Sequence, residues 1–448
     1  MLILNYAYLL SIFLSPNIYY FLTGNNERFI GMSELLLVAL VFMNFLVFIK
    51  EKKSLFPVLH KDKNIKRIFI LPLLILLWGV AGIPFTPIID GQTISFLIKY
   101  LLVIILFIQT SYISTIYMKS GKAYMTLNKI MLFISASIIL VSLLEIVAPG
   151  VVHTIYAYNF ENKESVWLAE NRLTGTAGTP NTYAILVYCV SAFLLAKAFG
   201  RKFFDVHSFM IGFMVLITFV IIALTGSRSA LIAFVGQLGV FSFLSLKGRI
   251  KGYLPVMFFM IIFQSAIFIV FFYSADIMNT LFQIGTSDSY YQIVIQRMLG
   301  SSAIIQFVPP ALLERLFFWY QGLSAYIHLP FYKYFLGIGL NNSEVIISRF
   351  TDLELGSVHN SYIQYLLSTG AVGLIMFLTL LKTVFQSLKN HQETHNGLFL
   401  YLFFFGLIIH SFFESNFLWN FKSMQMFFYF YGLFIAEKSL KSDLWRPA

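Results

Sequence analysis

The chain has 448 residues, of which 58% are hydrophobic, 18% aromatic and only 11% charged. This composition excludes an ordinary soluble globular domain and predicts a protein that crosses a membrane many times. The single cysteine, Cys189, excludes a disulfide framework and a cysteine-ligated metal site, and membrane topology rather than nucleic acid binding explains the net charge of +11.

Apolar segments of roughly 20 residues, long enough to cross the hydrocarbon core, recur along the chain. They predict an all-α membrane protein with about twelve transmembrane helices. The first segment lacks the basic start and small-residue cleavage site of a signal peptide, so we expect it to be a span. The expected spans cover about 3 to 22, 30 to 49, 68 to 86, 94 to 116, 130 to 148, 181 to 199, 209 to 225, 229 to 246, 253 to 273, 361 to 381, 397 to 413 and 421 to 437.

Lysine and arginine are distributed unevenly over the connecting segments. If the amino terminus is cytoplasmic, the short basic loops, such as those at 50 to 67 and 247 to 251, all lie on the inner side. We therefore expect both termini to be cytoplasmic. A basic inner fringe is also attracted to anionic membrane lipids.

Two long loops face outwards in this topology, at about 149 to 180 and about 274 to 358, and the last three spans follow at about 361 to 437. The sequence has no internal repeat or low-complexity stretch, so we expect residues 1–448 to form a single polytopic membrane domain. The larger loop contains aromatic-rich runs, such as Ser302 to Tyr326, that are expected to lie along the membrane surface as amphipathic helices.

The outer segments keep arginines that the topology does not explain, and the first is Arg172 in NRLTGTAGTPNTYA. Gly175 and Gly178 permit tight turns there, and Asn181 can cap the span that follows. Glycines and a proline alone would mean only a turn. A glycine-bearing turn that leads into a helix amino terminus beside an arginine also suits a phosphate, so Arg172 is a candidate anion ligand.

The second motif is LTGSRSAL, a very short outer turn at residues 224–231 that contains Arg228 and no acidic residue. An arginine so near the hydrocarbon pairs with a carboxylate, extends to lipid headgroups or binds an anionic substrate. Gly226 and the two serines favour close approach of the backbone to a ligand, and therefore the anion.

The third motif is ERLFFWYQGL, followed by FLGIGL, which contains Gly337 and Gly339. Arg315 precedes Trp319 by four residues, so the two side chains share one face of the expected helix. Such a face is a platform for a sugar or an interfacial anchor, and tryptophan at a membrane boundary is commonly an anchor.

The fourth motif is SVHNSYIQYLLSTGAVG, residues 357–373. Asn360 or Ser361 can cap the apolar helix that runs through Leu380, which places His359 at the positive end of the helix dipole. A histidine there tends to be neutral and available as a base, although it is equally compatible with an interfacial residue held by a backbone carbonyl.

The remaining outer histidines, His153 and His328, lack a comparable context, and His410 lies within a span as a core residue. Glu414, just beyond the eleventh expected span, is the second candidate, either as the base itself or as the group that orients His359.

Together these motifs resemble the O-antigen polymerase and O-antigen ligase superfamily, bacterial membrane glycosyltransferases that use sugars carried on polyprenyl diphosphate. The resemblance covers about half of the chain, and the first five spans match only in being hydrophobic. The matching residues are Arg172, Gly175, Pro180 and Asn181, then Arg228, then Arg315, Trp319, Gly337 and Gly339, and finally the stretch from His359 to Gly373.

The resemblance implies a type-C glycosyltransferase fold that works without a metal or other cofactor, with an active site facing the periplasm or outside of a bacterial (inner) membrane. It implies that Arg228 and Arg315 hold the donor diphosphate and that His359 is the essential histidine. Arg172 is a further expected diphosphate ligand, and Arg349 is an additional cation without a supporting motif. The turn reads GSRSA where the family often has a second glycine.

The chemistry agrees with this assignment. Cleavage of the anomeric bond releases a diphosphate whose growing charge needs a metal or fixed cations, and arginine forks match its oxygens. No outer cluster of aspartate and glutamate has convincing magnesium-ligand spacing. The acceptor hydroxyl loses its proton as it attacks, which a neutral histidine can take up. Inversion at the anomeric carbon is implied by the family alone.

We therefore expect an O-antigen or capsule repeat-unit polymerase, which transfers a growing glycan from undecaprenyl diphosphate to the next lipid-linked repeat unit. A ligase that transfers the glycan to lipid A core is the alternative, and a chain-length regulator is an expected partner. A transporter for the lipid-linked sugar would need ionisable groups within spans, for which only Lys99 and Glu145 are candidates.

Overall fold

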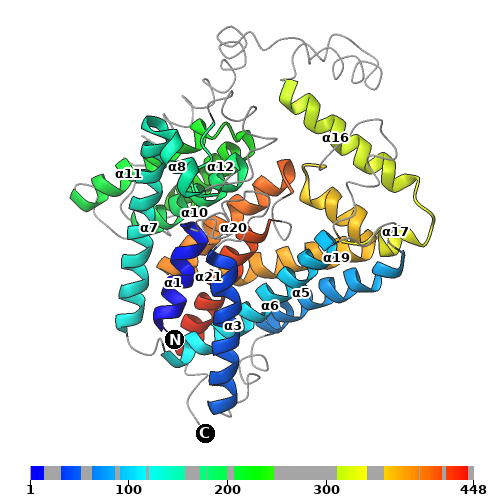
Figure 1. The fold of residues 1–448 in the computed structure, drawn as a ribbon, viewed down its shortest axis with the longest axis horizontal. Helices are drawn as coiled ribbons and strands as arrows, with labels where there is room; N and C mark the ends of the chain where they lie inside the picture. Colours follow the sequence, from blue (N-terminus) through cyan, green and yellow to red (C-terminus); the bar gives the residue numbers. More distant parts are fainter. Residues whose placement is uncertain are drawn as a thin grey trace.

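The computed structural model describes twelve stretches of the chain and, within them, the protein is helical throughout and has no β-strand, which confirms the all-α prediction (Figure 1). The described residues are 2–14, 32–51, 63–85, 91–117, 121–156, 172–177, 179–198, 206–246, 310–340, 358–392, 394–415 and 420–441.

The helices follow the expected spans closely where the two can be compared. They are α1 (Leu2–Phe13), α3 (Met32–Glu51), α5 (Lys63–Ala81), the 3₁₀ turn η1 (Ile83–Phe85), α6 (Gly91–Tyr117), α7 (Gly121–Val147), α8 (Pro149–Ile155), α10 (Pro180–Ala198), α11 (Val206–Leu224), α12 (Arg228–Leu246), α16 (Pro310–Ile327), α17 (Lys333–Leu336), α19 (Ser361–Lys389), α20 (His395–Phe413) and α21 (Phe421–Lys441).

Five of the described helices are long and apolar enough to cross a membrane, which supports an integral membrane protein. They are Thr126–Val147, Pro180–Ala198, Arg228–Ser245, Ser361–Lys389 and His395–Phe413. Shorter apolar helices lie on four other expected spans, at Ile3–Phe13, Met32–Val47, Phe96–Ser111 and Phe209–Leu224. The total of twelve stays a prediction, and the expected span at 253 to 273 lies outside the described residues.

Two helix groups meet in one aromatic-rich core. On one side α10 is buried along almost its whole length and packs against α11, α12 and α20. On the other side α21 packs against α6, where Phe107 contacts Phe428 with ring centroids 5.2 Å apart. In Figure 1 the blue α1 lies beside the red α21, and α3 packs against α1.

Helix α19 is broken at Gly370, where φ is 67° and ψ is −172°. The segment FLGIGL reaches into the break from α17, and Gly337 there also has a positive φ of 72°. A Cβ at Gly370 would overlap the Phe335 carbonyl, and a Cβ at Gly337 would overlap the backbone of Ser368. The two glycines are therefore required by close backbone approach as well as by their conformation.

Breaking a helix inside a membrane protein frees backbone carbonyl groups that have to find other donors. At this break the donors come from the FLGIGL segment and from α5. The bonds join Ile338 N to Leu367 O at 3.0 Å, Gly339 N to Ser368 O at 2.9 Å and Trp78 Nε1 to Thr369 O at 3.0 Å. This docking fixes the segment that carries α16 against the helix that begins after His359.

Candidate active site

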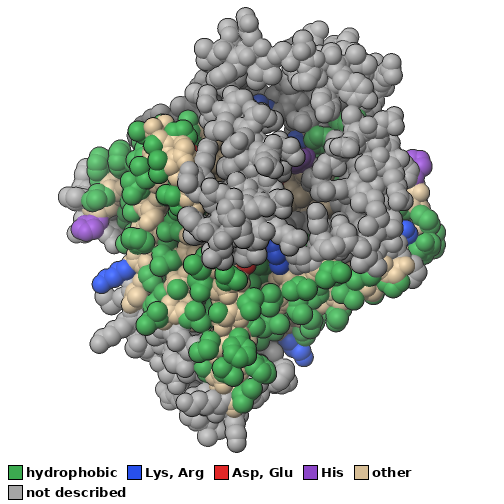
Figure 2. Space-filling view, viewed as in Figure 1, with side chains coloured by type: hydrophobic (Ala, Val, Ile, Leu, Met, Phe, Trp, Pro, Cys, Tyr) green, Lys and Arg blue, Asp and Glu red, His purple; other side chains and the backbone are tan. Residues whose placement is uncertain are grey.

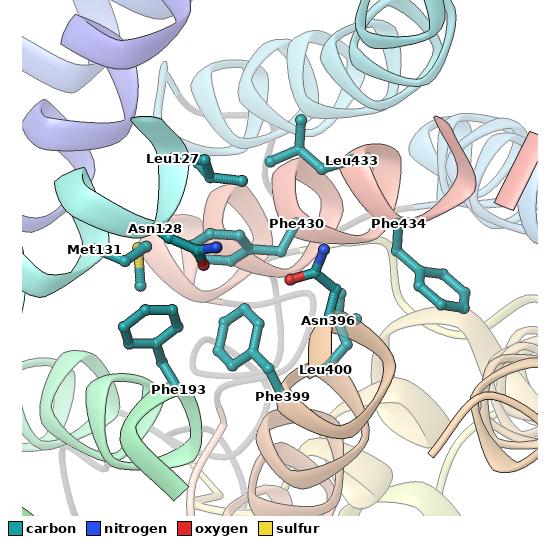
Figure 3. A pocket seen from close by; sticks show the side chains of 10 residues that line it. All are labelled: Leu127, Asn128, Met131, Phe193, Asn396, Phe399, Leu400, Phe430, Leu433 and Phe434. Atoms are coloured by element: carbon teal, nitrogen blue, oxygen red, sulfur yellow. The ribbon is translucent and has the colours of Figure 1, made fainter. Parts of the chain in front are cut away.

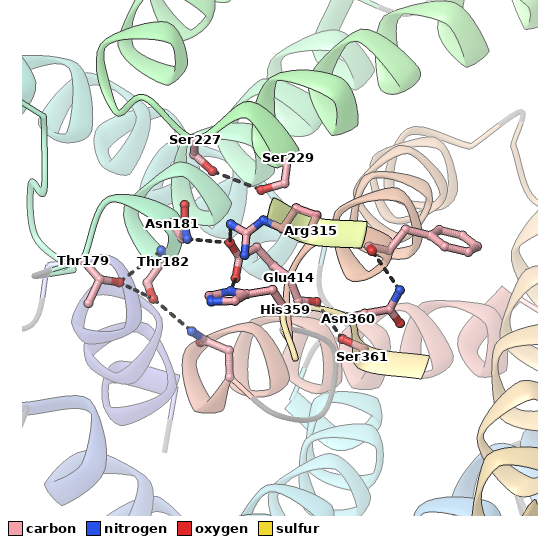
Figure 4. A network of polar contacts seen from close by, with 12 residues as sticks. Thr179, Asn181, Thr182, Ser227, Ser229, Arg315, His359, Asn360, Ser361 and Glu414 are labelled. Atoms are coloured by element: carbon pink, nitrogen blue, oxygen red, sulfur yellow. Dashed lines mark hydrogen bonds and ion pairs between the residues drawn. The ribbon is translucent and has the colours of Figure 1, made fainter. Parts of the chain in front are cut away.

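A buried carboxylate, Glu414, joins four parts of the chain at one end of the bundle (Figure 4). Its Oε1 accepts hydrogen bonds from Arg315 Nη2 at 2.7 Å and from Asn181 Nδ2 at 2.8 Å. Its Oε2 lies 2.9 Å from His359 Nδ1. The site therefore combines the end of α20, the start of α10, helix α16 and the entrance to α19.

The start of α19 is fastened directly to the end of α20. Asn360 is the helix cap, as predicted, and its side-chain oxygen accepts from the backbone N–H groups of Tyr362 and Ile363. The Asn360 amide donates to the Phe412 carbonyl at 2.9 Å, and the Ser361 hydroxyl donates to the Glu414 carbonyl at 3.0 Å. Capping thus also sets the position of His359 relative to Glu414.

His359 has a φ of 51° and is the one described residue other than glycine with a positive φ. This left-handed conformation is unfavourable for an ordinary side chain and persists only where the surroundings enforce it. Because a carboxylate can only accept, the Nδ1 atom facing Glu414 carries the proton, and in the neutral ring Nε2 is then the basic nitrogen. The arrangement therefore presents a base with a fixed tautomer.

Opposing effects act on the pKa of Glu414. Burial raises the pKa of this carboxyl, but the hydrogen bond from His359 and the charge of Arg315 lower it more, so the pKa lies below its usual value. Glu414 is therefore ionised at neutral pH and balances the Arg315 guanidinium. Arg315 uses Nη2 for this contact, and its side chain is 24% exposed, so the guanidinium is still within reach of a ligand.

Arg172 supports the short turn before α12. Its Nε donates to the Thr225 carbonyl at 2.8 Å, and the backbone N–H of Leu173 donates to the Leu224 carbonyl at 3.1 Å. Gly226, with a φ of 64°, leaves no room for a Cβ because Arg172 occupies that space. Residues 172–177 and the GSR turn are thus built as one unit.

Arg228 begins α12 and has an exposed side chain. Gln237 of α12 packs against Gly406 of α20. Arg228 lies nine residues before Gln237, at the start of α12, and Glu414 lies eight residues after Gly406, just beyond the end of α20. At 1.5 Å per residue both positions are about 12 to 14 Å from the contact, at the same end of the bundle. The structure therefore brings Arg228 to the level of the Glu414 cluster.

Trp319 lies one turn after Arg315 and contacts the residue that precedes Glu414. Its ring centroid is 6.1 Å from that of Phe413, which agrees with the predicted shared face of α16. Among the described residues its buried Nε1 has no hydrogen-bond partner. Arg349, the additional expected cation, lies outside the described residues.

The two charges considered for a transporter have local partners. Glu145, near the end of α7, accepts from the backbone N–H of Thr174 at 2.9 Å and that of Gly175 at 2.7 Å, and so holds the segment 172–177. Lys99 forms an ion pair with Glu34 at 2.8 Å.

Asn181 was expected to cap α10, and this prediction is wrong. Pro180 occupies the first helical position, and the Thr179 hydroxyl instead accepts from the Thr182 backbone N–H at 3.3 Å. Asn181 lies one position further on, which directs its amide to Glu414. Its place in the site had no local sequence signal, because the contact joins residues 233 positions apart.

A small cavity at the other end of the bundle, lined by Phe193, Phe399 and Phe430 among others, has a volume of only about 20 Å³ (Figure 3). This is room for roughly one water molecule and excludes a sugar or diphosphate.

An all-helical chain with membrane-spanning helices, whose ends gather an arginine, a histidine and a buried carboxylate, has the features of an integral membrane enzyme. Residues 213–378 match the family described as O-antigen ligase. This segment contains Arg228, Arg315 and His359, and the match supports the predicted resemblance to the O-antigen polymerase and ligase superfamily. No curated protein matches the chain.

Proposed function

We propose that the protein is a repeat-unit polymerase that transfers a growing glycan from undecaprenyl diphosphate to the next lipid-linked repeat unit on the outer face of a bacterial membrane. The supporting observation is the convergence of Arg315 and His359 on the buried carboxylate of Glu414. One group is a fixed cation and the other is an oriented base, and glycosyl transfer needs both.

The cation serves the leaving group. When the bond between the anomeric carbon and the diphosphate oxygen breaks, negative charge grows on the diphosphate, and a guanidinium binds its oxygens bidentately while staying charged. Arg315 and Arg228 hold this group, and Arg172 positions the turn that carries Arg228. Trp319 offers its ring and its buried N–H to a sugar beside them.

The base serves the acceptor. The acceptor hydroxyl oxygen forms the new bond to the anomeric carbon, and its proton passes to Nε2 of His359. Glu414 then faces an imidazolium, whose charge it stabilises. In this scheme arginines rather than a metal stabilise the negative charge of the diphosphate. Direct attack of the acceptor hydroxyl gives inversion at the anomeric carbon.

The proposal is tested with purified protein in lipid nanodiscs supplied with a synthetic undecaprenyl-diphosphate-linked repeat unit. We expect a ladder of longer products that forms equally well in the presence of a chelator. Arg228→Ala and Arg315→Ala each abolish the ladder while the protein elutes as a monodisperse, membrane-inserted species. A ladder that vanishes with chelator, or that persists in both arginine variants, would contradict the proposed site.

A ligase is the second candidate because the matched family carries that description. Both reactions use the same donor site and differ in the acceptor. The same preparation, given lipid A core as the acceptor, separates them. Transfer to lipid A core without a ladder identifies a ligase, and a ladder without that transfer identifies a polymerase. A chain-length regulator is an expected partner of the polymerase, and added regulator would narrow the ladder.

A further inference from the structure

A groove with a volume of about 380 Å³ lies between α3, α6 and the start of α21. Apart from one charged pair its lining is apolar, and every lining residue lies outside the segment that matches the O-antigen ligase family. We call it the α3–α6 groove. Its apolar lining consists of Leu37, Val38, Ile94, Ile98, Leu102 and Phe421.

The walls of this groove suit a hydrocarbon chain. Val38, Ile94 and Ile98 are 53%, 51% and 55% exposed, although each is a large apolar side chain on a helix of a membrane protein. These side chains face hydrocarbon in the bilayer, where a prenyl chain contacts them as an ordinary acyl chain does, so selection of one lipid depends on the charged residues beside them. The volume lies within the usual range for a small-molecule site, roughly 300 to 1,000 Å³.

One charged cluster marks the groove. Lys99 Nζ lies 2.8 Å from Glu34 and 5.3 Å from the centre of the Phe421 ring. Lys422, the next residue on α21, is buried and donates to the Thr176 carbonyl at 3.2 Å. A cation that borders a hydrocarbon groove is complementary to a lipid with an anionic headgroup.

Two hydrogen bonds relate the start of α21, which lines the groove, to the Glu414 cluster. Phe421 follows Asn420, whose Nδ2 donates to the Thr182 hydroxyl at 2.9 Å. Thr182 is next to Asn181 at the start of α10, and Asn181 binds Glu414, as Figure 4 shows. The groove wall and the Glu414 carboxylate are therefore anchored to the same helix start.

We infer that the α3–α6 groove binds the prenyl chain of a second polyprenyl diphosphate lipid, the acceptor, with its phosphates at Lys99. The inference rests on the proposed function, because joining two lipid-linked glycans requires a binding site for each lipid. Arg315 reaches Glu414 from α16 and serves the donor, whereas the groove approaches the same carboxylate through α21 and α10.

The test uses a diazirine-bearing polyprenyl diphosphate without sugar and the full-length protein in nanodiscs of phosphatidylethanolamine and phosphatidylglycerol. After illumination, peptide mapping is expected to find the label on α3 and α6. Excess unlabelled undecaprenyl diphosphate removes the label, and extra phosphatidylglycerol does not. Absence of label from α3 and α6, or equal competition by phosphatidylglycerol, would overturn the inference.

Substitutions sharpen the result. Ile98→Trp fills the groove and is expected to reduce labelling about tenfold, whereas Leu101→Trp, on the same helix but not in the groove, leaves it unchanged. Lys99→Gln weakens binding about fivefold, and Glu34→Gln strengthens it because Lys99 is released from its partner. Equal effects of the two tryptophans, or the same sign for Lys99→Gln and Glu34→Gln, would overturn the assignment.

Lipid binding in the groove and polymerisation of the glycan are measured separately, so each can be refuted without the other. His359→Asn, which removes the proposed base, keeps full labelling if the groove is a lipid seat. An intact ladder without labelling of α3 and α6 refutes the groove and leaves the polymerase standing. Specific labelling without any ladder refutes the acceptor role together with the polymerase.

Discussion

At the level of single residues, His359 carries most of the chemical argument, and its backbone conformation permits a clean test. Asparagine tolerates the left-handed region better than most residues, and its amide can donate to Glu414 as the imidazole does. It cannot accept the acceptor's proton. We therefore expect His359→Asn to fold normally and to lose activity by about 10²- to 10⁴-fold, measured as initial ladder formation.

The matched control is His328→Asn at the end of α16, where the histidine is exposed and bonds to the Ser324 carbonyl. It is expected to keep wild-type activity. Retained polymerisation in His359→Asn would remove this residue from the mechanism.

Glu414 gives a prediction about pH. Its folded-state pKa is below the usual value of 4.5, so its ionised form stabilises the folded protein relative to the unfolded chain. This contribution is fully present above the unfolded-state pKa and is lost as the pH falls through the lower folded-state pKa. The melting temperature of the wild type should therefore exceed that of Glu414→Gln by a constant margin near neutral pH, and the margin should shrink in acid below about pH 4.5.

Intrinsic tryptophan fluorescence of both proteins in detergent, recorded across the acidic range, measures this margin. A margin that grows on acidification would mean that protonation stabilises the site, and the ion-pair interpretation would be wrong. At neutral pH the same variant should also lose most activity, since the glutamine amide no longer fixes the tautomer of His359.

The residue-scale comparison shows where sequence is informative. The cap at Asn360 and the shared face of Arg315 and Trp319 follow from local spacing, and the structure confirms both. Glu414 was only a second candidate because the three partners of its carboxylate lie in distant segments. Asn181 was assigned to capping for the same reason, since no local pattern reports a contact across the fold.

At the level of elements, the break in α19 links two motifs that look unrelated in sequence. The G-x-G of FLGIGL and the TGAVG of α19 form one interface, in which backbone meets backbone at Gly337 and Gly370. Periodicity predicted a continuous helix here, because a single glycine hardly changes the apolar pattern. The break became visible only through the positive φ and the donors that reach the freed carbonyls.

Gly370→Ala is therefore expected to destabilise the protein by about 1 to 3 kcal/mol from the left-handed conformation alone, and by more because the Cβ overlaps the Phe335 carbonyl. Displacing this segment also moves α16, so activity should fall through loss of the Arg315 contact. Thermal unfolding in detergent and ladder formation measure the two effects.

Gly212→Ala in α11 is the control, because a Cβ there meets nothing within 4 Å. Alanine at that position should leave stability unchanged or increase it by up to about 1 kcal/mol. Equal behaviour of the two variants would show that the break in α19 does not depend on glycine.

At the level of the whole molecule, composition predicted the class and helix content, whereas the arrangement depended on contacts that composition does not encode. Figure 2 shows the apolar side chains spread widely over the described surface, as expected for a protein surrounded by lipid. The helix ends that carry Asn181, Arg228 and Glu414 gather at one end, because α10, α12 and α20 pack side by side. The orientation in the membrane is predicted only from the distribution of lysine and arginine, and cysteine labelling measures it directly.

The predicted topology places His328 outside and Asn390, which follows α19, inside. Asn390 follows the last residue of α19, at the opposite end of this helix from His359. The native thiol of Cys189 is buried, which gives a low background for labelling. In intact cells an impermeant maleimide should label His328→Cys and should label Asn390→Cys only after permeabilisation. The reverse labelling pattern would mean that the protein has the opposite orientation in the membrane. The Glu414 cluster would then face the cytoplasm, which contradicts the proposed transfer on the outer face.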